Sequence, residues 1–252
     1  LKGKPVRKAI WKWWERRCFA PLSKMLTVNE AIANAYRKEY GLEVGVVPNV
    51  SERMDPAMPM PRSGLGWPEE RTVLLIQGAF MDRDRGALDA VRALVHLPDC
   101  HLALIGAGPE HAQAAGVAAQ CGVADRVHVH DRMPFASLRR CTAAADIGLS
   151  LDRSTVDNFR FSLPNKLFDY LHAGLPVVCS DLPVAGKFVQ EEGIGAVAKN
   201  ADNAADIARA VSAAVEQVLS TPPAKAHLAA VARRHHWEAH KETLLAAIHP
   251  LD

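Results

Sequence analysis

The chain has 252 residues, 49% of them hydrophobic, and its 30 Lys and Arg against 28 Asp and Glu give a formal net charge of +2 at pH 7. This length can bury a sizeable core in one large or two small domains, and the near balance of charge gives no indication of a nucleic-acid partner. No apolar run approaches the roughly 18 residues that span a bilayer, and the five scattered cysteines are predicted to be reduced core residues of a cytosolic protein.

The first 17 residues interleave Lys and Arg with Trp11, Trp13 and Trp14. A basic amphipathic pattern of this kind is typical of helices at membrane surfaces. Trp11, Trp14 and Cys18 also form a stripe at i, i+3 and i+7, which would equally suit packing against a further domain. Both interpretations stay open at this point.

Residues 51–70 lack periodicity and contain four prolines. Such a stretch is predicted to be an interdomain linker. Residues 1–50 should therefore belong to a different domain from the residues that follow the linker.

Six short apolar runs alternate with helical stretches between residues 71 and 220, which indicates β-α units on a parallel sheet. Apolar residues at helical spacing mark helices around Leu88, Val91 and Leu94, and again over residues 204–218. We expect a doubly wound, Rossmann-like α/β domain that binds its ligand outside the carboxyl ends of the strands. The expected strands are residues 72–76, 101–105, 127–129, 145–149, 176–179 and 196–198.

The most informative stretch is residues 161–180, with the sequence FSLPNKLFDYLHAGLPVVCS. Pro164 and Asn165 stand where a first-turn proline and an N-cap belong, and Gly174 ends the helix before a buried strand. Backbone N–H groups and the positive end of a helix dipole favour an anion there, and Lys166 adds a full positive charge. The pattern predicts a diphosphate site at the helix start.

Five short motifs follow one another along this part of the chain: residues 78–86 with a basic residue before Gly86, LIGAG at 104–108, DRV at 125–127, ADIGL at 145–149, and the Pro-x-Lys-x-x-acid-Tyr run at 164–170. In this order they resemble the C-terminal, donor-binding half of retaining GT-B glycosyltransferases of family 4, over roughly residues 70–245. The resemblance implies a GT-B-type domain over residues 71–220. It also implies a remnant of the N-terminal acceptor domain in residues 1–50, and C-terminal helices in residues 221–252 that return toward that domain.

For the site, the resemblance implies that Arg85 and Lys166 are the catalytic cations, which stabilise the nucleoside diphosphate as it leaves. Asp169 takes the place of the second glutamate in the family's Glu-x7-Glu motif and would accept hydrogen bonds from the ribose hydroxyls. Two positions depart from the family pattern: Ala79 stands where an arginine is common, and Phe161 stands at the first glutamate. The other expected donor-binding residues are Gly78, Gly86, Gly106, Met133, Ser162, Leu163, Pro164 and Asn165.

We therefore expect a hexosyltransferase-type glycosyltransferase, which moves a sugar from a nucleotide-sugar donor to a glycan or lipid-linked acceptor with retention and without a metal or other cofactor. Its expected setting is bacterial cell-envelope polysaccharide biosynthesis, in the cytoplasm or on the inner face of the membrane. Because the chain starts at Leu1 and most of the acceptor domain is missing, we expect a fragment that is inactive alone. Two alternatives stay open: a nucleotide-sugar epimerase of the same fold, and a non-catalytic nucleotide-binding or interaction module.

Overall fold

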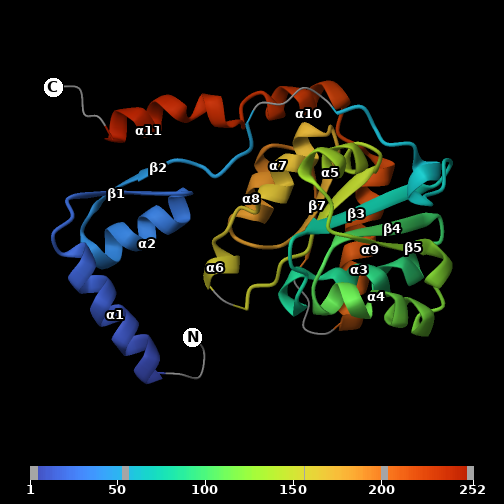
Figure 1. Cartoon of the computed structure of the whole chain (residues 1–252), viewed down its shortest axis with the longest axis horizontal. Coiled ribbons are helices and arrows are strands. Elements are labelled where there is room, and N and C mark those ends of the chain that lie inside the picture. The colour runs from blue at the N-terminus through green and yellow to red at the C-terminus, as the bar shows by residue number, and fades with distance from the viewer. Residues whose placement is uncertain (1–4, 53–56, 156, 200–203, 249–252) are drawn as a thin grey trace. The chain divides into compact units, whose positions relative to one another are not determined.

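The structure, a computed structural model, describes residues 5–52, 57–155, 157–199 and 204–248 (Figure 1). The chain forms two compact units. The smaller comprises Leu1–Asn49 together with Trp237–Asp252, and the larger comprises Val50–His236.

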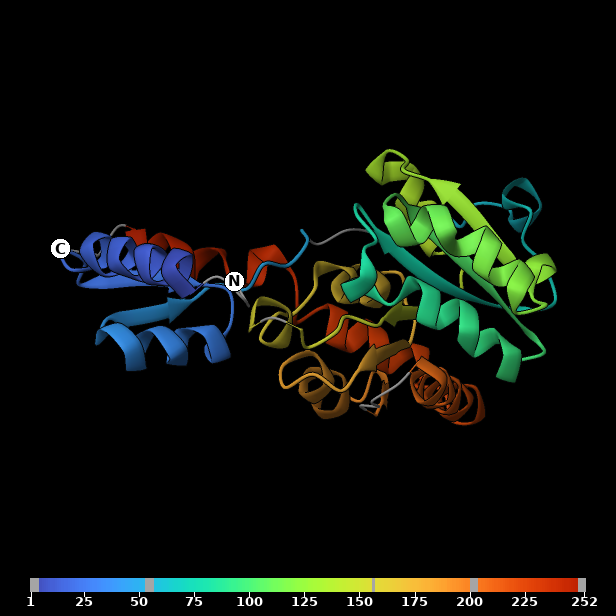
Figure 2. The ribbon, with the colours of Figure 1, turned by 90° about the horizontal axis from the view of Figure 1, so that it is seen from below.

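The smaller unit contains a two-stranded parallel sheet, whose elements appear in blue in Figures 1 and 2. Its α2 begins after Asn29, whose side chain accepts the N–H of Ile32 at 3.0 Å, and ends at Gly41 in the left-handed conformation. No helix in the described part of the chain is long and apolar enough to cross a membrane. The elements are α1 (Pro5–Phe19), β1 (Lys24–Thr27), α2 (Glu30–Tyr40), β2 (Glu43–Val46), the 3-10 turn η5 (Trp237–Ala239) and α11 (Lys241–Ile248).

The larger unit is built on a six-stranded parallel sheet with the strand order β5-β4-β3-β6-β7-β8. Each of the six predicted apolar runs overlaps one strand, so the prediction of a doubly wound, Rossmann-like α/β fold is confirmed. The strands are β3 (Thr72–Gly78), β4 (Cys100–Gly106), β5 (Val127–Asp131), β6 (Ile147–Ser150), β7 (Val177–Ser180) and β8 (Gly195–Ala198).

Helices cover both faces of this sheet, and alternate residues of each strand point to opposite faces. In β3, Leu74 and Ile76 pack with α3, α4 and α9, whereas Val73 and Leu75 pack with α5, α7, α8 and α10. Burial on both faces explains why the strands are continuous apolar runs. The helices are α3 (Ala87–Ala93), α4 (Pro109–Gln120), α5 (Phe135–Thr142), α6 (Asp157–Arg160), α7 (Asn165–His172), α8 (Ala185–Glu191), α9 (Ala204–Ser220) and α10 (Lys225–Ala232), with 3-10 turns η1 (Arg62–Leu65), η2 (Arg83–Arg85), η3 (Leu94–His96) and η4 (Ala124–Arg126).

Residues 57–70, in the segment predicted as a linker, belong to the larger unit. Arg62 donates to the carbonyl of Ala144 at 2.9 Å and pairs with Asp146 at 2.7 Å. Trp67 is 3% exposed, and its indole N–H donates to His130 Nε2 at 3.0 Å. This part of the segment is therefore packed against the sheet, while residues 53–56 lie outside the described residues.

The sheet changes direction between β3 and β6, because the chain moves outward from β3 to β5 on one side and from β6 to β8 on the other. β3 and β6 are aligned only at Leu74 with Ile147 and at Leu75 with Gly148. Beyond these pairs the buried Tyr170 hydroxyl lies between the strands, 3.1 Å from Gln77 N and 3.2 Å from the Leu149 carbonyl. Ligands of such sheets bind at this topological switch point.

The cysteines are not all in the core. Cys100, Cys141 and Cys179 are buried, and Cys121, which caps the end of α4, is half-buried and packs against the core, but Cys18 is exposed on α1, so the prediction of five core cysteines is wrong for Cys18. Cys18 lies on a helix surface that the scattered spacing of the cysteines did not distinguish from the sheet. Burial raises the pKa of Cys100 to about 11 and that of Cys179 to about 12.

We expect a thiol reagent at pH 8 to modify Cys18 rapidly and to reach Cys100, Cys141 and Cys179 only after unfolding, because thiolates are the reactive species and buried thiols stay protonated. Mass spectrometry of peptides after timed labelling measures this. In a Cys18→Ser variant the fast labelling should be lost. Rapid labelling of Cys179 in the folded protein would contradict the burial of β7.

Candidate functional site

Two loops at the carboxyl ends of β3 and β4 are in backbone contact. The Met81 N–H donates to the Ala107 carbonyl at 2.6 Å, and Met81 is 1% exposed. A Cβ on Gly106 would lie 2.0 Å from the carbonyl oxygen of Gly78, and one on Gly108 would lie 2.6 Å from Met81 N. Gly106, expected in the donor site, therefore lets the two loops approach closely.

The 3-10 turn η2 carries Arg85 from the loop after β3 toward the end of β6. Asp82 opens this turn by accepting the N–H of Asp84 at 3.1 Å. Gly86 closes it with φ of 71°, and a Cβ there would lie 2.5 Å from the Leu151 carbonyl oxygen. The turn therefore fixes Arg85 beside the residues that follow β6.

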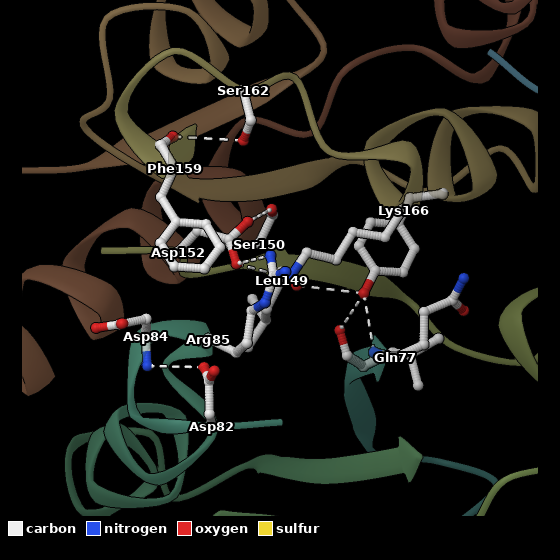
Figure 3. A network of polar contacts seen from close by, with 12 residues as sticks. Gln77, Asp82, Asp84, Arg85, Leu149, Ser150, Asp152, Phe159, Ser162 and Lys166 are labelled. Carbon is white, nitrogen blue, oxygen red and sulfur yellow. Dashed lines mark hydrogen bonds and ion pairs between the residues drawn. The ribbon is translucent and has the colours of Figure 1, made fainter. Parts of the chain in front are cut away.

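The start of α7 differs in detail from the expectation. Pro164 has a ψ of 136°, which is extended, so it occupies the cap position and Asn165 is the first helical residue, with no side-chain cap. Ser162 just before it donates from its hydroxyl to the Phe159 carbonyl at 3.3 Å (Figure 3), and Leu163 is partly buried against the core. Lys166 follows in the first turn, with 12% of its side chain exposed.

Arg85 and Lys166 converge on one carboxylate (Figure 3). Asp152 Oδ1 lies 3.0 Å from Arg85 Nη1 and 3.3 Å from Lys166 Nζ, and the Asp152 side chain is 1% exposed. The Phe159 ring centroid lies 4.6 Å from Arg85 Cζ, a cation–π contact. The structure thus brings both predicted cations together at the switch point. The residue that joins them, Asp152, was not predicted from the sequence.

The charge state of Lys166 depends on this arrangement. Burial lowers the pKa of the Lys166 ammonium below its usual range, and Arg85 lowers it further, while Asp152 raises it. A buried ammonium needs an anion close by to remain charged. Asp152 supplies that anion within the protein, and a phosphate group would do the same.

Asp169 is one helical turn beyond Lys166, and residues at i and i+3 share a helix face. Its Oδ1 accepts from the Ser51 hydroxyl at 3.1 Å, and its Oδ2 accepts from Gln77 Nε2 at 2.9 Å. Burial raises the pKa of Asp169 above its usual range, and the hydrogen bonds from Ser51 and Gln77 act in the opposite direction. Two donors therefore orient a half-buried carboxylate.

Beside this carboxylate lies a cavity of about 20 Å³, room for about one water. Phe135, at the start of α5, lines the same cavity and is 52% exposed. Exposed aromatic rings offer a stacking surface to planar ligands. Phe135 is a further residue of the region that the sequence did not predict.

The remaining predicted residues lie nearby or in the core. Met133 is partly buried against the core, with its sulfur 3.5 Å from Cys141 Sγ. The Phe161 ring centroid lies 5.3 Å from Arg160 Cζ. Among the described residues no group of three or more His, Cys, Asp or Glu is placed to hold a metal ion.

Asp152, Gln77 and Ser51 did not stand out in the sequence, because none belongs to a recognised motif. One signal was available for two of them. Gln77 is the penultimate residue of β3, and Asp152 follows β6 by two positions, so both lie at the carboxyl ends where such sheets bind ligands. No signal marked Ser51, whose partner Asp169 is 118 positions away.

Three solved structures that share this fold are a glycosyltransferase, an O-GlcNAc transferase and a sucrose-phosphate synthase. WaaG, a glycosyltransferase involved in lipopolysaccharide biosynthesis, aligns with 88% of this chain and 62% of its own, at 16% identity and a TM-score of 0.65. The pneumococcal O-GlcNAc transferase GtfA in complex with UDP and GlcNAc aligns with 93% of this chain and 46% of its own, at 13% identity and a TM-score of 0.71. Sucrose-phosphate synthase from Thermosynechococcus elongatus aligns with 92% of this chain and 61% of its own, at 18% identity and a TM-score of 0.67.

These likenesses define the class: the larger unit has the Rossmann-like fold of GT-B glycosyltransferases. The chain spans about half to two thirds of the length of these structures. The family model of glycosyl transferases group 1 matches residues 71–217, and the chain belongs to that family. A search of curated protein sequences finds no match.

Proposed function

We propose that the protein transfers a hexosyl group from a nucleotide-sugar donor to a glycan or lipid-linked acceptor, and that the larger unit binds the donor. The observation that carries this proposal is the pair of cations, Arg85 and Lys166, held at the switch point of a GT-B-type sheet. A nucleoside diphosphate gains negative charge as it leaves the sugar, and cations fixed in advance stabilise that charge. Asp169, oriented by two donors, suits the ribose hydroxyls.

If the diphosphate binds between Arg85 and Lys166, the nucleoside base would lie toward α5. There the exposed ring of Phe135 could stack on the base. Retention at the anomeric carbon and membership of family 4 are proposed from the order of the sequence motifs. We also propose that donor binding needs no metal, since the cations of the site would neutralise the phosphates. Binding should then persist in EDTA.

For the acceptor we propose a lipid-linked or glycan substrate of the bacterial cell envelope, used on the cytoplasmic side of the membrane. The support lies on α1, where Trp11 is 60% exposed, Trp13 58% and Trp14 52%, beside Arg7, Lys8 and Arg16. Exposed tryptophans among basic side chains suit an anionic lipid surface. Sedimentation with anionic vesicles tests this, and equal binding to neutral vesicles would argue against it.

Calorimetric titration of the 252-residue chain with nucleoside diphosphates of all common bases, with and without EDTA, tests the proposal. We expect one of them to bind. If none binds, a non-catalytic interaction module is favoured. The full-length protein with the selected donor and lipid or glycan acceptors should transfer sugar, with retention visible by NMR, and the 252-residue chain alone should not. Free epimerised nucleotide sugar formed without acceptor would favour an epimerase.

The ribose assignment gives a separate prediction. Asp169→Asn should weaken binding of the ribonucleoside diphosphate by about 2- to 10-fold, and that of the deoxy analogue much less, since a hydrogen bond to a charged group is roughly 1 kcal/mol stronger than a neutral one. Asparagine keeps the size but loses the charge and one acceptor. If both ligands lose affinity equally, Asp169 does not bind the ribose hydroxyls.

A further inference from the structure

Asp152 lies beneath the two cations. Its side chain is 1% exposed, whereas that of Lys166 is 12% exposed and that of Arg85 is 34% exposed. An anion arriving from solvent therefore meets Arg85 and Lys166 first. The same carboxylate oxygen, Oδ1, contacts both cations, while Oδ2 lies 3.4 Å from the Ser150 hydroxyl.

Both cations have donors to spare. A guanidinium carries five N–H donors and an ammonium three, and Asp152 uses one of each. A diphosphate can therefore bind Arg85 and Lys166 as well. To do so it has to share or replace the contacts of the buried Asp152 carboxylate, which is also negatively charged. Two like charges this close repel strongly in a partly buried site.

We propose that Asp152 is a positioning residue of the donor site, whose carboxylate aligns Arg85 and Lys166 and exchanges with the donor's diphosphate for these two cations. This inference rests on the proposed function. Asp152 then has two opposing effects: it keeps the cations aligned, and it lowers the affinity of the site for the diphosphate. A transferase that must release a nucleoside diphosphate after each reaction benefits from such a limit.

Asp152→Asn separates charge from shape, because the amide oxygen still accepts hydrogen bonds from both cations. We expect the variant to bind pyrophosphate, and the nucleoside diphosphate selected by the donor panel, about tenfold more tightly, since the repulsion between like charges is removed. The parent nucleoside should bind with unchanged affinity. Titrations repeated at falling pH favour the charged form of Lys166, whose pKa burial lowers and Asp152 no longer raises in the variant.

Asp146→Asn is the matched control. Asp146 is a carboxylate of the same unit that also pairs with an arginine, Arg62 at 2.7 Å, but it precedes β6 and therefore lies at the amino end of the sheet, away from the two cations. Its neutralisation should not tighten diphosphate binding. A loss of structure can only weaken binding, so a gain confined to Asp152→Asn and to phosphate-bearing ligands identifies the proposed exchange.

The wild-type chain provides a second test that does not depend on a variant folding. In a crystal structure with pyrophosphate, at least one of the Arg85–Asp152 and Lys166–Asp152 contacts should be replaced by a contact to a phosphate oxygen. If wild type binds neither pyrophosphate nor any nucleoside diphosphate, the proposed function and this inference both fail. If wild type binds them but folded Asp152→Asn binds no more tightly, or both Asp152 contacts persist with ligand bound, this inference alone is overturned.

Discussion

Replacement of Lys166 by alanine is expected to weaken nucleoside diphosphate binding by about 10- to 100-fold while leaving nucleoside binding nearly unchanged. The reason is that a hydrogen bond between charged groups contributes roughly 1.5–3 kcal/mol, and about 1.4 kcal/mol corresponds to a factor of ten. Lys166 is suited to such a contact because it lies in the first turn of α7 with most of its side chain shielded from solvent. Calorimetric titration with both ligands measures the two affinities.

Two further variants make this result specific. Lys166→Met keeps most of the side-chain volume without the charge, so it should behave like Lys166→Ala if charge is the cause. Lys187→Ala removes an exposed lysine of α8, paired with Glu191 at 3.6 Å, and should change neither affinity. An equal loss for nucleoside and nucleoside diphosphate, or no loss, would remove Lys166 from the diphosphate site.

Gly86→Ala is expected to lower the free energy of unfolding by about 2 to 4 kcal/mol, because two penalties add. Gly86 has a backbone φ of 71°, which residues other than glycine rarely adopt. The new Cβ would also lie 2.5 Å from the Leu151 carbonyl oxygen. Relief of that clash has to move η2 away from the residues after β6. Arg85 and Asp152 would then separate, so diphosphate binding should weaken as well.

Gly116→Ala is the control for this substitution. Gly116 lies in α4, and a Cβ there has no neighbour within 4 Å, so alanine should stabilise the helix by roughly 0.5–1 kcal/mol. Denaturant unfolding of both variants by circular dichroism compares them directly. Wild-type stability in Gly86→Ala would show that the contact between η2 and Leu151 is looser than described.

The sheet could be predicted from the sequence because parallel strands buried on both faces are continuous apolar runs. Residues 72–76 are such a run, yet β3 continues to Gly78, which pairs with Gly106 in β4. That extension comes from pairing with a neighbouring strand and involves a glutamine and a glycine, which apolar patterning does not reveal. The short helix α6 was likewise missed, since four residues are too few to show a helical period.

The site could be predicted only where local motifs carried it. Lys166 and Asp169 belong to one helix start, and Arg85 precedes a glycine at a spacing that resembles a family. Asp152 is different, because its role depends on two cations that are 67 and 14 positions away in the chain. Contacts of that kind are set by the packing of β3, β6 and α7 against one another, and the sequence pattern of each element alone does not contain them.

The small overlap between β3 and β6 has a consequence for how the larger unit folds. Strands β3 to β5 are consecutive neighbours, and so are β6 to β8, so each half of the sheet can form by pairing segments close in sequence. Joining the halves is the long-range step, and only two aligned residue pairs support it directly. Further support comes from Asp146, which exchanges hydrogen bonds with Val73, and from the hydroxyl of Tyr170, which bonds to both strands. We therefore expect docking of α7, which carries both Tyr170 and Lys166, to join the two halves of the sheet and to complete the cation site at the same time.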